Sequence, residues 1–198
     1  MRVLGRFVAV AAFALLAAAS DGAAADEDDV DAEIACLALT IYHEARGEPE
    51  QGKLAVGHVV MNRTRDGRFP DGVCDVVQEG GEQRHRCQFS WWCDGLSDRP
   101  RDKAALRQSL RLAQAVYHGC LPDPTRGALW YHSTAVKPAW SGTSGPAKKI
   151  GRHVFYRGAP GIETASAARV RWTDRDKNSG SGCRAPGPGR TPRLMAAG

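Results

Sequence analysis

The first regular pattern of apolar residues in the chain has the spacing of a helix. Apolar side chains recur three or four positions apart, as on one buried helical face, at Ile34, Leu37, Ala38 and Ile41. Gly47 and Pro49 follow this series, and both residues are typical of a helix end. The pattern predicts a helix that ends near Gly47, with Glu44 on or beside its buried face, one turn after Ile41.

Two later stretches also have helical periodicity. One helix is expected from Pro49, a favoured first helical residue, to Arg63, and another from Lys103 to His118. Between them, residues 73–77 form an apolar run that is too short to separate a strand from a helical turn. The first two thirds of the chain therefore predict a helical body.

Short aromatic runs replace the helical pattern after residue 127. Residues 128–132 and 153–156 are bounded by turn-forming residues and predict strands. Residues 136–145 contain Pro138, Trp140 and several glycines, which predict a surface loop. The expected fold is of the α+β class, a mainly helical body with a small β-hairpin or aromatic lobe.

The N-terminus has the pattern of a cleaved secretory signal. Two arginines precede the apolar residues 7–19, and small residues at 23–25 precede an acidic run. The apolar part is short for a membrane span, although an uncleaved anchor is the alternative. We expect residues 1–25 to be a signal peptide, so that the protein is exported to the periplasm or cell envelope without stable membrane insertion after cleavage.

The rest of the chain divides into an acidic segment (26–32), a folded domain (33–160) and a basic Gly/Pro-rich tail (161–198) that we expect to be disordered. From Thr164 onward the tail carries seven Lys or Arg against two Asp, so the folded domain is about neutral. A nucleic-acid partner is not expected, because such proteins carry their positive charge on the folded body. We expect a monomer.

Six cysteines in an exported chain indicate disulfides. Cys74, Cys87 and Cys93 are close in sequence and predict at least one local bridge. Five cysteines precede the tail, the other two being Cys36 and Cys120, so either Cys183 reaches back to them or one thiol stays free. A zinc site is not favoured because Cys-x-x-Cys pairs are absent from the sequence, and we expect no metal or cofactor.

Glu44 is the strongest candidate for chemistry. His43 and Glu44 could begin a metalloprotease motif, but its fifth position is Gly47, which cannot bind zinc, and the sequence has no Gly-x-Ser-x-Gly. A carboxyl group beside apolar residues favours its protonated form, which suits a general acid that cleaves a glycosidic bond. The alternative is that Glu44 only pairs with Arg46 or Arg63.

Several motifs in order resemble the SleB family of cell wall hydrolases, over about residues 33–157. They are residues 38–48, 52–63, 69–70, 88–91, 131–132, 138–140 and 150–156. The resemblance implies a lysozyme-like peptidoglycan hydrolase domain. We expect this catalytic domain to be residues 33–160 and to be braced by the disulfides that the cysteines indicate. Family members cut between N-acetylmuramic acid and N-acetylglucosamine, in the characterised cases as lytic transglycosylases.

The resemblance also implies roles for individual residues. The catalytic glutamate of the family matches Glu44. Candidate contacts to peptidoglycan glycan strands are Asn62, Gln88, Phe89, Ser90, Tyr131 and His132, and Trp91 joins them as a ring that could stack on a sugar.

Two alternatives to a transglycosylase stay open. A hydrolytic muramidase would need a second carboxylate, for which Asp94 is the plausible distant candidate, because Glu48 and Glu50 are expected to be solvated residues of the next helix. A module that binds glycan strands without cutting them would keep the aromatic residues but would not depend on Glu44.

Overall fold

The computed structural model describes residues 21–81, 84, 86–145 and 147–158, with side chains from residue 27 onward. Most of the expected signal peptide and the whole expected tail lie outside the described residues. The regular elements are, in order, α1 (Asp21–Ala45), α2 (Glu50–Arg63), α3 (Val73–Gln78), the 3₁₀ helix η1 (Ser90–Trp92), α4 (Lys103–Tyr117), β1 (Trp130–Ser133), the 3₁₀ helix η2 (Ala139–Gly142), β2 (Ala147–Ile150) and β3 (His153–Tyr156).

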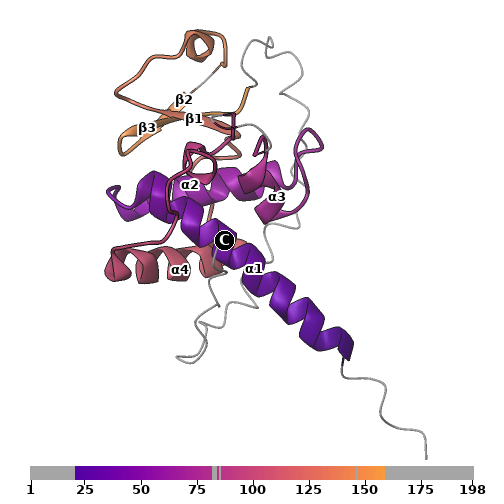
Figure 1. Ribbon diagram of the computed structural model, residues 1–198. Helices are drawn as coiled ribbons and strands as arrows, with labels where there is room; N and C mark the ends of the chain where they lie inside the picture. The colour runs from indigo at the N-terminus through magenta and orange to yellow at the C-terminus, as the bar shows by residue number, and fades with distance from the viewer. Residues whose placement is uncertain (1–20, 82–83, 85, 146, 159–198) are drawn as a thin grey trace, which may run out of the picture.

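Helix α2 lies at the centre of the molecule. Its residues 52–63 are all buried, because α1 and α4 cover one side of it and the sheet covers the other. Figure 1 shows these layers, with α4 at one end and the three strands at the other. A helix that is buried on every side needs apolar or small residues over most of its surface and internal partners for its polar side chains. In α2, Lys53 and Arg63 donate to backbone carbonyls.

Helix α1 contacts α2, α3 and α4, while its N-terminal turns project away from the body (Figure 1). The series predicted from sequence forms its inner face: Ile34, Leu37, Ala38 and Ile41 are at most 2% exposed. They pack in the main core with residues of α2, α3, α4 and η1. No helix among the described residues is both long enough and apolar enough to cross a bilayer.

The helices follow the predicted bounds closely. Pro49 precedes α2 as its N-cap, α4 ends one residue before the predicted His118, and residues 73–77 belong to the helix α3. Asp102 caps α4 by accepting hydrogen bonds from the backbone N–H groups of Ala104 and Ala105. The α+β prediction is confirmed.

The expected small hairpin or aromatic lobe is a three-stranded antiparallel sheet in the order β1-β3-β2, which has one strand more than the two predicted. The strands 130–133 and 153–156 agree with the prediction, but β2 was missed. Ala147, Lys148 and Lys149 are exposed in this edge strand. Charged residues are common in edge strands, and they hide the apolar alternation from which a strand is predicted.

A second, smaller core joins the sheet to the helices. Phe155 from β3 packs there with Ala45 from the end of α1 and with Ala55, Val56 and Val59 from α2. Tyr131 contacts both the main core and this second core. The end of α1, where Glu44 lies, is therefore fixed between the helical body and the sheet.

An ion pair between exposed Arg152 and buried Glu48 holds the turn between α1 and α2 against the turn between β2 and β3. The Glu48 carboxylate accepts hydrogen bonds from the backbone N–H and the side-chain Nε of Arg152, at 2.8 and 2.7 Å. Gly151 has a positive φ of 58°, and a side chain there would collide with Glu48. The expectation that Glu48 is solvated is wrong, because this residue is only 5% exposed.

Two disulfides brace the body. Cys36–Cys74 ties α1 to α3, and Cys87–Cys93 closes a short loop around η1, which confirms the local bridge predicted within the cysteine cluster. Cys120 is disulfide-bonded as well, and Cys183 lies outside the described residues. The loops closed by the bridges restrict the unfolded chain, so both stabilise the fold.

Candidate active site

Glu44 lies in the last turn of α1 and is half-buried. Its Oε2 accepts a hydrogen bond of 3.0 Å from the hydroxyl of Tyr131 in β1. Its other oxygen, Oε1, accepts no hydrogen bond from the described residues and is not among their fully buried, unpartnered atoms. Oε1 is therefore the oxygen that faces solvent.

The surroundings of Glu44 favour its neutral form. Burial raises the pKa of the Glu44 carboxyl above its ordinary value, although the hydrogen bond from Tyr131 and the charge of Arg63 act in the opposite direction. The expectation of a desolvated acid at the end of this helix agrees with this direction. A raised pKa lets this carboxyl group keep its proton to higher pH than an ordinary glutamate does.

Among the described residues, Glu44 has no counter-ion in contact. The ion pairs among the described residues are Arg68–Asp66 and Arg152–Glu48, so neither Arg46 nor Arg63 lies within 4 Å of the Glu44 carboxylate. Arg46 is exposed and lies over the Tyr42 ring, 5.2 Å from its centroid. The alternative that Glu44 serves only as an ion-pair partner is therefore not supported.

Arg63, at the end of α2, places a buried positive charge near Glu44. Its side chain is 1% exposed, and its Nε donates to the carbonyl of Leu129 at 2.8 Å. The guanidinium also lies 5.2 Å from the ring centroid of Phe69 and 5.5 Å from that of Phe89. Gln88, with its amide oxygen turned toward Arg63, accepts from both terminal nitrogens at 3.3 Å.

Arg63 is the site residue that sequence reasoning considered only as an ion-pair partner. A usable signal was present, because Val56, Val59, Val60 and Arg63 have the spacing of one helical face, which places Arg63 on the buried side of α2. Burial lowers the pKa of Arg63, while the charges of Tyr131, Glu79 and Glu44 raise it. Gln88 and Phe89, predicted to bind glycan, here hold Arg63 in place.

Tyr131 and His132 are adjacent in sequence but lie on opposite faces of the sheet, because successive strand residues alternate. Tyr131 points to the helices and reaches Glu44. His132 bonds the Tyr156 hydroxyl through Nε2 at 2.9 Å, and the Trp140 ring packs against it at 5.6 Å. The structure therefore brings Tyr131 to Glu44 and turns His132 away from it.

The other predicted site residues differ in their burial and in the groups they contact. Asn62 is 7% exposed and donates to the Asp123 carboxylate and the Ala128 carbonyl, both at 3.0 Å, so its amide is used inside the protein. Trp91 is 7% exposed and stacks on His43, the residue before Glu44, at 4.6 Å. Ser90 is exposed at the start of η1.

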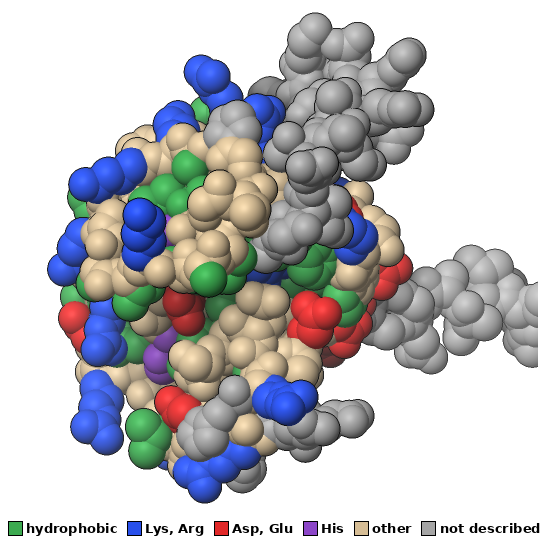
Figure 2. Space-filling model, turned by 90° about the horizontal axis from the view of Figure 1, so that it is seen from above, with side chains coloured by type: hydrophobic (Ala, Val, Ile, Leu, Met, Phe, Trp, Pro, Cys, Tyr) green, Lys and Arg blue, Asp and Glu red, His purple; other side chains and the backbone are tan. Residues whose placement is uncertain are grey.

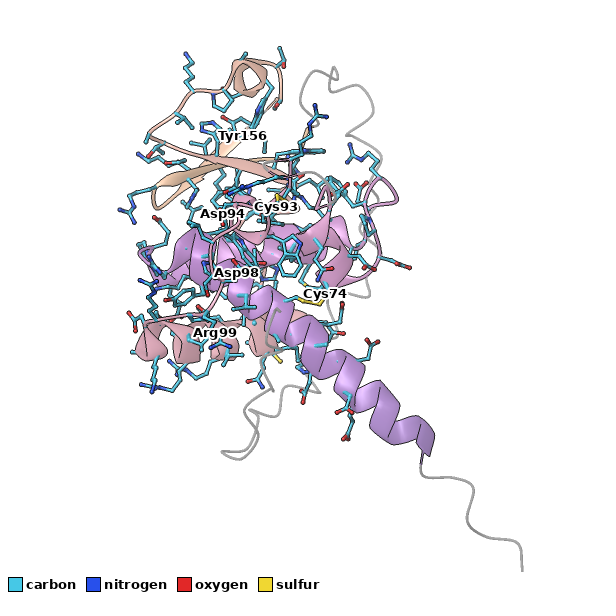
Figure 3. The ribbon with its side chains drawn as sticks, in the orientation of Figure 1. Cys74, Cys93, Asp94, Asp98, Arg99 and Tyr156 are labelled. Carbon is cyan, nitrogen blue, oxygen red and sulfur yellow. A yellow bond between two sulfur atoms is a disulfide. The ribbon has the colours of Figure 1, made fainter. Side chains whose placement is uncertain are left out.

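Glu48, Glu50 and Asp94 were considered from the sequence as a second carboxylate. Glu50 is exposed in the first turn of α2, as expected. Glu48 is occupied by Arg152, and hydrogen bonds from Arg152 outweigh burial and lower the pKa of Glu48. Asp94 accepts from the backbone N–H of Leu96 at 2.7 Å, in the connection that descends from η1 to α4 (Figure 3). Asp98 lies further along it, and burial raises the pKa of this carboxyl.

A hollow of about 690 Å³ opens beside α3, away from Glu44. It is lined by Asp75, Gln78, Glu79, Gly80, Gly81, Arg86 and Trp92. Figure 2, seen from the sheet end, shows acidic side chains and a histidine at a second depression, with Lys and Arg around the outer edge. The described residues contain no group of three or more His, Cys, Asp or Glu that could hold a metal ion.

Glu44 has a raised pKa and one oxygen that accepts no hydrogen bond from the described residues. The comparison with known families identifies the family of the chain. The chain belongs to the Cell Wall Hydrolase family, whose profile matches residues 47–156. The family resemblance predicted from the motifs is thereby confirmed. The matched range begins three residues after Glu44, so the support for Glu44 comes from its own setting.

Curated relatives are spore cortex-lytic enzymes. Those of Halalkalibacterium halodurans and Oceanobacillus iheyensis are each 32% identical over 126 residues, which cover 63% of this chain and 34% and 41% of theirs. The enzyme of Bacillus subtilis is also 32% identical, over 62% of this chain and 37% of its own. The chain therefore matches less than half the length of these relatives.

Two solved structures are similar to this chain. One is the catalytic domain of the germination-specific lytic transglycosylase SleB from Bacillus anthracis, with 32% identity, 63% of this chain and 93% of that chain covered, and a TM-score of 0.48. The other is the catalytic domain of the SleB protein of Bacillus cereus, with 30% identity, coverages of 66% and 90%, and a TM-score of 0.46.

Proposed function

We propose that this protein cleaves the glycan strands of peptidoglycan between N-acetylmuramic acid and N-acetylglucosamine, as a lytic transglycosylase with Glu44 as general acid and base. Membership of the Cell Wall Hydrolase family supports peptidoglycan as the substrate class. The observation that carries the mechanism is the state of Glu44, a half-buried carboxyl group without a contacting counter-ion and with one oxygen open to solvent.

In the first step, Glu44 gives the proton on Oε1 to the oxygen of the scissile bond. The bond between that oxygen and C1 of the muramic sugar breaks, and its electron pair stays on the oxygen. N-acetylglucosamine leaves with a free hydroxyl, and positive charge develops on the muramic ring. Glu44 is now ionised, and the charge of Arg63 and the hydrogen bond from Tyr131 stabilise it in this form.

In the second step, the C6 hydroxyl of the muramic sugar attacks C1. Its proton passes to the Glu44 carboxylate, which restores the acid, and the product is a 1,6-anhydro sugar. Water is not consumed, and one carboxylate is sufficient. Glu44 must therefore release and recover a proton in each cycle, as a carboxyl group with opposing influences on its pKa can do.

The hydrogen bonds already made by Glu48 and Asp94 support transglycosylation over hydrolysis, because hydrolysis needs a second carboxylate at the site. A hydrolase uses a second carboxylate about 5–9 Å from the first to activate water or stabilise charge. Glu48, the nearest acid in sequence, is held by Arg152, and Asp94 accepts a backbone hydrogen bond within its own loop. A muramidase that uses Asp94 remains the alternative reaction for the same site.

The proposal includes the surroundings of the reaction. The catalytic domain is residues 33–160, it is exported to the periplasm or cell envelope, and it acts as a monomer. Tyr131 contacts the acid, Trp91 stacks on His43 beside it, and Gln88 contacts Arg63. Gln88 and Ser90 are the exposed members of the predicted set and are proposed to contact sugar directly. Asn62, Phe89 and His132 are proposed to act on the glycan only indirectly.

Mass spectrometry of fragments released from purified peptidoglycan tests this function. The protein without its signal peptide should release fragments that end in 1,6-anhydromuramic acid, and Glu44→Gln should release none. Reducing muramic ends would identify a hydrolytic muramidase. Retained binding to peptidoglycan without release by either protein would favour a module that does not cut.

A further inference from the structure

Tyr131 is the residue that joins the sheet to the proposed acid. It lies on the face of β1 that points to the helices, and its hydroxyl donates to Glu44 Oε2 at 3.0 Å across 87 residues of sequence. Oε1 is left without a hydrogen bond from the described residues and faces solvent. The two oxygens of the carboxyl group are therefore not equivalent.

This difference decides where the transferable hydrogen sits. A protonated carboxyl group carries one hydrogen, and the oxygen without it is the better acceptor. Because Oε2 accepts from the Tyr131 hydroxyl, the hydrogen belongs on Oε1. That is the oxygen that a glycosidic bond could approach from solvent.

We propose that Tyr131 is a positioning residue for Glu44, which keeps the transferable proton on Oε1 rather than contacting the sugar itself. The inference rests on the proposed function and deepens it. It also changes the role that the family resemblance implied for Tyr131, from a glycan contact to a partner of the acid.

The surroundings of the Tyr131 ring support this role. His153 packs edge-on against the ring with centroids 5.3 Å apart, and Phe155 packs on it at 5.5 Å. Tyr131 is half-buried and packs against both cores, so much of its ring is used inside the protein. Burial, together with the charge of Glu44 and the hydrogen bond to it, raises the pKa of Tyr131 well above its ordinary value, so the phenol stays a donor.

Two groups act electrostatically on Glu44 from the elements around it, Arg63 at the end of α2 and Tyr131 in β1. Both favour the ionised carboxylate. Removal of the Tyr131 hydroxyl should therefore raise the pKa of Glu44 further, because burial would be opposed by Arg63 alone. This effect can be measured without any enzymatic assay.

The test compares Tyr131→Phe with Tyr156→Phe. Both variants lose one hydroxyl from the same sheet, but the Tyr156 hydroxyl bonds His132 on the opposite face. The carboxyl carbon of Glu44 is titrated by ¹³C NMR in each, with its resonance assigned through Glu44→Gln. Tyr131→Phe should move the midpoint to higher pH, and Tyr156→Phe should leave it where the unmutated protein has it.

Kinetics on a soluble glycan fragment give a second readout. A positioning role predicts that Tyr131→Phe lowers kcat about tenfold, a typical loss for one hydrogen bond to a charged group, and changes KM little. An unchanged Glu44 midpoint in Tyr131→Phe overturns the inference whether or not the protein is active. A raised KM with an unchanged kcat would also overturn it, since that is the effect of a lost sugar contact. Failure of the proposed function would instead appear as full activity of Glu44→Gln.

Discussion

Glu44 and Glu48 are four residues apart at the junction of α1 and α2, and their carboxyl groups are in opposite states. The Glu44 carboxyl is half-buried without a contacting counter-ion, so burial dominates and raises its pKa. The Glu48 side chain is only 5% exposed and burial acts to raise its pKa, but hydrogen bonds from Arg152 outweigh burial and lower it. The comparison teaches that the partners of an acid, together with its burial, decide whether it serves chemistry or the fold.

The largest predicted difference between the two residues is in activity. Glu44→Gln keeps the shape of the side chain and an acceptor for Tyr131 but has no proton to give, so the rate of fragment release should fall about 10²–10⁴-fold. Glu48→Gln should keep the rate of the unmutated protein when the two are compared at equal concentrations of folded enzyme. Equal losses in both variants would contradict the division of roles.

The second predicted difference is in stability and has the opposite sign. Glu48→Gln weakens the hydrogen bonds from Arg152 that hold the sheet to the α1–α2 turn, and it should lower the free energy of unfolding by about 1–2 kcal/mol. Glu44→Gln removes an acid that is costly to ionise in the fold, so stability near neutral pH should stay the same or rise. Chemical denaturation of both variants measures this, and a larger loss for Glu44→Gln would show that Glu44 is structural.

The smallest predicted effect is on the pH dependence of stability. The pKa of Glu48 is lower in the folded protein than in the unfolded chain. Ionised Glu48 therefore stabilises the fold above its pKa in the unfolded chain, and this stabilisation is lost as pH falls through its pKa in the folded protein. The pKa of Glu44 is higher in the folded protein than in the unfolded chain. Protonated Glu44 therefore favours the fold below its pKa in the unfolded chain, and this stabilisation is lost as pH rises through its pKa in the folded protein. The free energy of unfolding is measured by denaturation from pH 3 to 8. Glu48→Gln should weaken its dependence on pH on the acid side, and Glu44→Gln should weaken it on the neutral side. Any other pattern contradicts the two pKa directions.

Local patterns in the sequence were sufficient to predict the helices and the setting of Glu44. The apolar spacing up to Ile41 placed Glu44 beside the core, and Pro49 marked the start of α2. The edge strand β2 could not be predicted, because its lysines hide the alternation of a strand. The spacing of apolar residues therefore predicts which face of a helix is buried. A charged edge strand lacks this pattern, so it can be recognised only from the strand with which it pairs.

Contacts between distant parts of the chain could not be predicted in the same way. Glu48 was expected to be solvated because its partner, Arg152, is 104 residues later in the sequence. The family resemblance gave Tyr131 and its neighbour His132 the same role as glycan contacts, but the alternation of β1 puts the two on opposite faces of the sheet. The position of a candidate residue follows from its motif, but its role depends on which face of its strand or helix it occupies.

The measurement that tests the central claim most directly is the pH dependence of kcat/KM on a soluble glycan fragment, for the unmutated protein and for Glu48→Gln. If protonated Glu44 is the acid, kcat/KM should fall as pH rises through a limb above the ordinary glutamate pKa, and the limb should be the same in both proteins. A limb at the ordinary glutamate pKa, or one that moves in Glu48→Gln, would contradict the assignment of Glu44 as the acid.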